Sequence, residues 1–232
     1  MALQSMQDKI ALLHERRAEL AAGGGEKRVA KQHEQGKLTA RERIGELLDD
    51  HSFQEMSVYS EHRANRFGMA GKSVPSDGVV VGQGTILGRL VHVASQDFTV
   101  LGGTIGELHA QKVANAANMA LRTGSPFICI NDSGGARVQE GIDALHGCGQ
   151  IFFQNVLLSG VVPQISILAG PCAGAAADWA IVYGCFSDAP AKAFSSSRYE
   201  VSSCVSDRTP LERPANCTRC GKVEVKRTKS PM

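Results

Sequence analysis

Apolar and charged positions alternate with a helical period near the start of the chain. From Ile10 to Leu20, apolar residues lie among charged ones, and glycines follow at 23–25, so we expect a helix that ends at these glycines. A second helix is expected in "LTARERIGELL", because Thr39 and Glu42 have the T-x-x-E spacing of a capping box. Residues 1–50 are therefore predicted to form a helical segment.

The pattern then changes to a period of two. "DGVVVGQGTILGRLVHVASQ" alternates and is interrupted by Gly82, Gly84 and Gly88, which is typical of consecutive strands joined by tight turns. A long helix is expected next, and Thr104 and Glu107 at its start again have capping-box spacing. The positions expected to face inward on this helix are Leu108, Val113, Ala116 and Leu121.

A strand, a glycine-rich turn and a helix then recur along the chain. The buried strand "SPFICIN" precedes the glycines of "DSGGA", a helix follows, and the strand "VPQISILAG" leads into "PCAGAA". This order predicts an α/β repeat whose ligand site lies where the strands end and the helices begin. Residues 51–177 are expected to be its core. Residues 178–232, which are rich in Ser, Pro, Arg and Lys and lack a period, are expected to be a poorly ordered tail.

Composition supports this class and excludes others. Hydrophobic residues make up 43% of the chain, aromatic residues 5%, and there are 25 glycines, as in a globular α/β protein. A net charge of +2 does not indicate a nucleic-acid partner. The N-terminus lacks the apolar run of an export signal, and no stretch is long enough to span a membrane, so we expect a soluble, cytoplasmic protein.

The seven cysteines predict reduced thiols, because their number is odd and their spacing is irregular. One alternative is a zinc site in which Cys217 and Cys220 act with Cys185 and Cys204. A structural zinc site normally shows two close-spaced ligand pairs, and only one is present here. No metal is therefore expected.

The stretch "ICINDSGGARVQEG" carries the candidate chemistry, with two interpretations. Ser133 could be a nucleophile, which requires a histidine base; His92 and His109 could fold nearby, but neither lies in a context that identifies a base. Alternatively, the glycines let backbone amides and a helix N-terminus approach a ligand and stabilise negative charge, as in an oxyanion hole. The recurrence of the pattern at Gly174 favours the amide cradle over a simple packing turn.

The stretch from "SDGVVVGQGTILG" through "NDSGGARVQEG", the N-terminal "KIALLHERRAEL", and "GPCAG" closely resemble the carboxyltransferase (β) subunit of biotin-dependent acyl-CoA carboxylases and decarboxylases. This family includes the propionyl-CoA carboxylase β subunit, methylmalonyl-CoA carboxyltransferase and decarboxylase, and glutaconyl-CoA decarboxylase. The resemblance covers residues 6–177 and implies an α/β, crotonase-like fold of repeated ββα units, here incomplete and preceded by N-terminal helices.

The resemblance also implies a reaction and a set of partners. A carboxyl group passes between biotin, held on a separate carrier protein or domain, and the α-carbon of an acyl-CoA. The biotin nitrogen removes the α-proton, and the thioester enolate attacks CO2, so that no side-chain base is obligatory. Family members are homo-oligomers with active sites between subunits. The resemblance does not indicate whether the reaction is this carboxyl transfer or the reverse decarboxylation.

Site residues follow from the same resemblance. The amides around Gly134, Gly135 and Ala136 are expected to stabilise an enolate oxygen of the thioester or of the biotin urea. Gly174 and Ala175 are expected to shape the same pocket.

Three arginines are expected at the cofactor or at the loop that binds it. Arg41 and Arg43 match a family segment near coenzyme A, and two cations on a helix suit its phosphates; an ordinary solvated helix face is the alternative. Arg137 is expected to hold the loop or the ligand.

The resemblance ends soon after Gly174, where this chain reads "AAADWAIVYGCF". Family subunits continue into a second crotonase-like domain that completes the active site. We therefore expect a truncated or frame-disrupted carboxyltransferase N-domain that binds coenzyme A weakly and does not complete carboxyl transfer alone. The alternative is a non-catalytic CoA-binding or subunit-assembly module of the same fold.

Overall fold

The computed structural model describes residues 5–176, 200–202 and 222–224. The helices are α1 (Met6–Ala21), α2 (Glu26–Glu34), α3 (Ala40–Leu47), α4 (Glu107–Thr123) and α5 (Ile142–Leu158), with short 3-10 turns η1 (Pro75–Gly78), η2 (Leu101–Gly103) and η3 (Val138–Glu140). The strands are β1 (Gln54–Met56), β2 (Val79–Ile86), β3 (Arg89–Gln96), β4 (Phe127–Ser133), β5 (Gln164–Cys172), β6 (Glu200–Ser202) and β7 (Lys222–Glu224).

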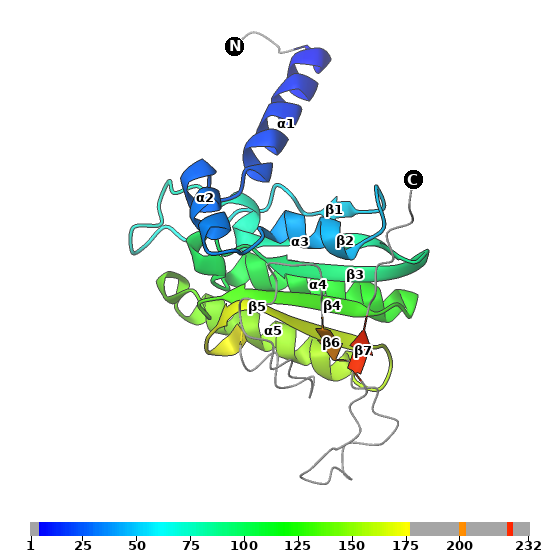
Figure 1. Cartoon of the computed structure of the whole chain (residues 1–232). Helices are drawn as coiled ribbons and strands as arrows, with labels where there is room; N and C mark the ends of the chain where they lie inside the picture. Colours follow the sequence, from blue (N-terminus) through cyan, green and yellow to red (C-terminus); the bar gives the residue numbers. More distant parts are fainter. Residues whose placement is uncertain (1–4, 177–199, 203–221, 225–232) are drawn as a thin grey trace.

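One five-stranded sheet, in the order β1-β2-β3-β4-β5, organises the fold. β1, β2 and β3 pair antiparallel, whereas β3, β4 and β5 run parallel. A two-residue turn joins β2 to β3, and both its residues, Leu87 and Gly88, have positive φ, which matches the twist of a hairpin. The chain thus forms the predicted ββα unit, β2-β3-α4, and then β4-α5-β5 (Figure 1).

Of the glycines at 82, 84 and 88, only Gly88 lies in a turn. Gly82 and Gly84 lie inside β2, although the alternating sequence suggested turns. A Cβ at Gly82 would lie 2.3 Å from the carbonyl oxygen of Gln54 on β1. The missing side chain therefore allows β1 to approach β2 closely.

Helices cover both faces of the sheet. On one face, α4 and α5 pack on alternate residues of the strands, among them Val79, Ala94, Phe127 and Cys129. On the other face, α3 packs on the intervening residues, among them Val80, Val93, Ile128 and Ile167. Because both faces are covered, β4 is buried at every position, which explains its continuous apolar sequence. By contrast, α1 extends away from the body of the fold and buries only Leu20 (Figure 1).

The helix starts show one confirmed and one wrong prediction. Thr39 and Glu42 form the expected capping box of α3. Thr104 does not cap α4, which begins after Gly106 without a side-chain cap from its own segment. Instead, the Glu140 carboxylate accepts a 2.7 Å hydrogen bond from the Glu107 amide. A residue distant in sequence thus satisfies a helix end that the local spacing assigned to Thr104.

The capping box of α3 gives a first testable prediction. Thr39→Ala removes the hydroxyl that accepts from the Glu42 amide and should lower the free energy of unfolding by about 1 kcal/mol in urea titrations. Thr123→Ala is the matched control, since its hydroxyl contacts carbonyl oxygens and Ser125 Oγ at the C-terminal end of α4 and caps no helix N-terminus. Equal effects of the two substitutions would show that the cap contributes nothing.

Within residues 178–232, the structure describes only the short antiparallel pair β6 and β7; the rest of the expected tail lies outside the described residues. Its boundaries, like those at residues 50 and 177, stay predictions. No helix in the described part of the chain is both long and apolar enough to cross a membrane.

Candidate functional site

The two glycine turns expected to carry the site lie next to each other. β4 ends at Ser133 and β5 ends at Cys172, and these two residues are partners in the parallel ladder. Beyond them, the Ala173 amide donates a 3.2 Å hydrogen bond to the Ser133 carbonyl oxygen. The turns that follow the two strands therefore meet at one edge of the sheet, as the strand order requires.

The close approach of the turns depends on Gly135. Its φ of +95° lies in a region that disfavours a side chain, and a Cβ there would lie 2.7 Å from the Ala173 carbonyl oxygen. Gly174 also has a positive φ, of +52°, but a Cβ on it would meet open space. Gly135 is therefore the position at which the contact between the turns is tightest.

The backbone amides of the first turn differ in what they bind. The Gly134 amide donates to the Gly102 carbonyl oxygen at 2.9 Å, and the Gly135 amide donates to Ser133 Oγ at 3.0 Å. Ala136 forms a parallel bridge with Ile105, in which the bonds run through the flanking residues. In this geometry, the Ala136 amide points away from Ile105. Of the three predicted amide donors, Ala136 is thus the best placed to reach a ligand.

The nucleophile interpretation of Ser133 has no support in this geometry. Ser133 is buried, and its hydroxyl accepts from the Gly135 amide. His92 Nδ1 lies 2.8 Å from Ser125 Oγ, and His109 Nδ1 lies 3.0 Å from the Asp77 carbonyl oxygen. Burial lowers the pKa of both imidazoles. Ser133 instead ends β4, and its hydroxyl holds the turn through its hydrogen bond with the Gly135 amide.

Cys172 also lies at the strand ends but is not an activated thiol. Burial, with the nearby Asp132 carboxylate, raises its pKa to about 11, so the thiol stays protonated at neutral pH. Among the residues that the structure describes, no cluster of three or more His, Cys, Asp or Glu could hold a metal ion. The four cysteines of the zinc alternative lie outside the described residues.

The first glycine turn is held by a buried carboxylate, which the sequence analysis did not identify. Asp132, just before the glycines, is fully buried and accepts from Gln32 Nε2 at 3.2 Å, Lys37 Nζ at 3.1 Å and Arg43 Nη2 at 2.6 Å. Arg43 also donates to the Ala169 carbonyl oxygen at 3.3 Å. We call Asp132 and its three donors the Asp132 anchor. It ties the turn to the N-terminal helical segment.

A second buried network holds the far side of the turn. The Arg137 guanidinium is fully buried and pairs with Asp77 and, at 2.7 Å, with Glu140. It also donates to the Thr104 carbonyl oxygen at 2.9 Å. Burial raises the pKa of Asp77, and the neighbouring guanidinium opposes this shift. Arg137 therefore lies within a loop-holding network, and a contact from it to a ligand stays a prediction.

The two arginines expected at coenzyme A point in different directions. Arg43 is 1% exposed and faces the Asp132 anchor. Arg41 is part-buried, pairs with Glu55 at 2.6 Å, and lines a cavity of about 340 Å³ beside Gly23 and Thr99. Of these two arginines, only Arg41 lines one of the cavities found among the described residues. Two positions along a helix correspond to a rotation of about 200°, so Arg41 and Arg43 face opposite sides of α3, and the sequence alone did not show which side packs on the sheet.

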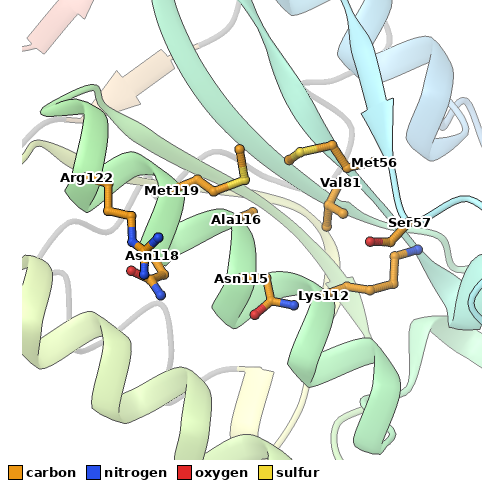
Figure 2. Close-up of a pocket in the computed structure, with 9 residues that line it drawn as sticks. All are labelled: Met56, Ser57, Val81, Lys112, Asn115, Ala116, Asn118, Met119 and Arg122. Atoms are coloured by element: carbon orange, nitrogen blue, oxygen red, sulfur yellow. The ribbon is translucent and has the colours of Figure 1, made fainter.

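Two further cavities flank the sheet. One of about 360 Å³ lies at the start of α5, beside Arg63, Arg66 and Glu140. The other, of about 410 Å³, is lined by residues of β1, β2 and α4 and by none of the glycine-turn residues (Figure 2).

Comparison with known proteins gives consistent matches. A family model described as the carboxyl transferase domain matches residues 31–181. The chain is 56% identical over 174 residues to the methylmalonyl-CoA decarboxylase subunit alpha of Veillonella parvula, covering 75% of this chain and 34% of that protein. It is 59% identical over 172 residues to the methylmalonyl-CoA carboxyltransferase 12S subunit of Propionibacterium freudenreichii subsp. shermanii, covering 74% and 33%.

A solved structure supports the same match. The hexameric transcarboxylase 12S, with methylmalonyl-coenzyme A and methylmalonic acid bound, superimposes with a TM-score of 0.76 at 56% identity, covering 78% of this chain and 36% of that chain. The chain thus spans about a third of the length of the relatives it matches.

Proposed function

Because the chain belongs to the carboxyl transferase domain family and has the N-terminal part of its crotonase-like fold, we propose that it contributes one half of an acyl-CoA carboxyltransferase site. The observation that carries this proposal is the pair of adjacent glycine turns, with the Ala136 amide directed away from Ile105. The substrate would be an acyl-CoA thioester, by analogy with the methylmalonyl-coenzyme A bound to transcarboxylase 12S.

In the proposed reaction, the first turn stabilises negative charge on an enolate oxygen. A fixed amide costs no reorganisation when charge develops, and one donor of this kind lowers a barrier by about 2.7–4 kcal/mol. Gly134 and Gly135 position the donor, since their own amides bond within the chain. Gly174 and Ala175, across the contact with Ala173, would form the facing wall of the pocket.

We propose that the Ala136 amide also serves the urea oxygen of biotin; the exposure of Gly134 and the partial exposure of Ala136 support access to it. Biotin on a separate carrier protein would supply the carboxyl group. Ser133 and Cys172 do not act as bases at the turn, because the Ser133 hydroxyl is buried against the Gly135 amide and the Cys172 thiol stays protonated at neutral pH. The α-proton must therefore leave to a group outside these residues.

A second candidate is a non-catalytic module that binds coenzyme A or assembles with other subunits. It is favoured by the matched part, which covers about a third of the relatives' length, and by the hexameric assembly of one of these relatives. We propose that the remaining part of such relatives completes the acyl pocket, so that this chain alone binds acyl-CoA without completing the transfer.

Calorimetric titration with propionyl-CoA tests the binding half of the proposal. Arg41→Gln removes the cation in the cavity beside Gly23 and should weaken binding about tenfold, the typical effect of losing one charge-assisted contact. Arg16→Gln is the control, because Arg16 pairs with exposed Glu19 on the protruding α1. No heat of binding, or equal affinity in both variants, would contradict the assignment of Arg41.

Turnover distinguishes the two functions. Carboxyl transfer from carboxylated biotin to propionyl-CoA would support an enzyme if Ala136→Pro, which lacks the amide hydrogen, abolishes it while Ala136→Ser preserves it. Binding without turnover in the folded chain would support the module.

A further inference from the structure

The groove of about 410 Å³ between α4 and the β1 edge of the sheet contains a buried cation that the proposed reaction does not use (Figure 2). Lys112 is 3% exposed, and its Nζ donates to the carbonyl oxygens of Ser76 at 2.7 Å and Val79 at 2.6 Å. An ammonium group has three hydrogens, so one remains for the groove that Lys112 lines.

The positive charge of Lys112 is not matched by a carboxylate of its own. Glu55 and Asp77 are close enough to influence it, but Glu55 pairs with Arg41 and Asp77 pairs with Arg137. Among the ion pairs of the described residues, none includes Lys112. A buried ammonium held only by neutral oxygens is costly, and an anion in the groove would compensate it.

Other donors surround this end of the groove. Asn115 lies one helical turn from Lys112 on α4, and Ser57 follows β1. Figure 2 shows the Lys112 and Ser57 side chains reaching toward the same end of the groove, with the Asn115 amide near the middle. An amino group, an amide and a hydroxyl can together satisfy the two oxygens of one carboxylate.

The rest of the groove differs in character. The Met56 and Met119 side chains extend toward each other, and Val81 lies beside Met56 (Figure 2). Flexible thioethers of this kind adapt to hydrocarbon of varied shape. Arg122, at the far end, forms no ion pair with any described residue and adds positive charge to the entrance.

We propose that this groove binds a small organic carboxylate, with the carboxylate at the Lys112 end and the hydrocarbon part against Met56 and Met119. This site is separate from the glycine turns and does not depend on the proposed function. A bare inorganic anion would lack the apolar contacts, and a neutral molecule would lack the charge contact.

Methionine methyl groups provide a local readout in the full-length chain. In a spectrum of ¹³C-methyl methionine, hexanoate should shift the Met56 and Met119 signals saturably and leave Met69 unchanged, since Met69 is 1% exposed in another cluster. Hexanol and inorganic phosphate should produce far smaller shifts. The absence of a saturable shift, an equal shift at Met69, or phosphate binding as tight as that of hexanoate would overturn the proposal.

Two variants separate binding from folding. Asn115 is exposed, so the Asn115→Asp variant should fold normally. Its new carboxylate has the same charge as hexanoate and should weaken hexanoate binding about tenfold or more. Lys112→Met should abolish the shifts. Asn118→Asp is the matched control near Arg122, and its effect should be smaller. Undiminished binding by Asn115→Asp would refute the carboxylate position.

Binding should also weaken with rising pH. Burial lowers the pKa of Lys112 to about 8, and the charged groups that face it are Glu55 from β1, Asp77 from η1 and Arg41 from α3. Because the protonated form attracts the carboxylate, affinity should fall about tenfold between pH 7 and pH 9. A flat profile would exclude Lys112 as the binding cation.

Discussion

Replacement of Asp132 by alanine should lower the free energy of unfolding by about 3–5 kcal/mol, the typical cost of breaking a buried ion pair from one side. The substitution leaves the cations of Lys37 and Arg43 buried without the carboxylate that binds them at 3.1 and 2.6 Å. It also deprives Gln32 of an acceptor. Chemical denaturation of the purified chain measures the loss.

Asp50→Ala is the control, because Asp50 is exposed and its removal should change stability by less than about 0.5 kcal/mol. A double-mutant cycle with Arg43→Leu sharpens the test. If the two residues act as one unit, the double variant should lose less stability than the sum of the single losses. Strictly additive losses would show that the pair contributes no coupling energy.

Gly135→Val should produce a second large effect, on both stability and the site. A side chain at a φ of +95° costs about 1–3 kcal/mol in backbone strain, and the clash at 2.7 Å from the Ala173 carbonyl oxygen adds about 1–3 kcal/mol of overpacking. The two glycine turns would have to separate, so the Ala136 amide would lose its position. Thermal unfolding and propionyl-CoA titration measure the two consequences.

The chain offers a close control one residue away. A Cβ at Gly134 would meet Thr104 Cγ2 at 3.5 Å, an ordinary contact, and Gly134 does not have a positive φ. Gly134→Ala should therefore leave stability within about 1 kcal/mol of the parent. If both substitutions have the same effect, the contact between the turns does not determine the geometry of the site.

Much of the fold could be predicted from periodicity because the relevant forces are local. The hairpin, the long helix after it and the strands around the glycine turns follow from alternating or helical apolar positions. The capping box at Thr39 was correct because its two partners lie within one turn. The short helix α2 was missed, since it is polar and buries only Gln32.

The errors share one physical origin, which is contact between distant segments. Thr104 had the right local spacing, but Glu140 supplies the acceptor at the start of α4. Arg43 looked like a phosphate-binding cation, yet it points to a carboxylate far along the chain. Local sequence cannot reveal such partners, because the sheet that brings them together is itself assembled from remote strands.

The Asp132 anchor has a consequence for the order of folding. Its donor Arg43 precedes Asp132 by 89 positions, and closing a flexible loop of that length costs about 4 kcal/mol in chain entropy. Because the ion pair gains little while its members remain hydrated, we expect it to form only after β2, β3 and β4 have assembled. During synthesis, the cationic partners leave the ribosome first and stay solvated until β4 emerges. We therefore expect the Asp132 anchor to form late in folding and to fix the glycine turn only after the surrounding sheet has formed.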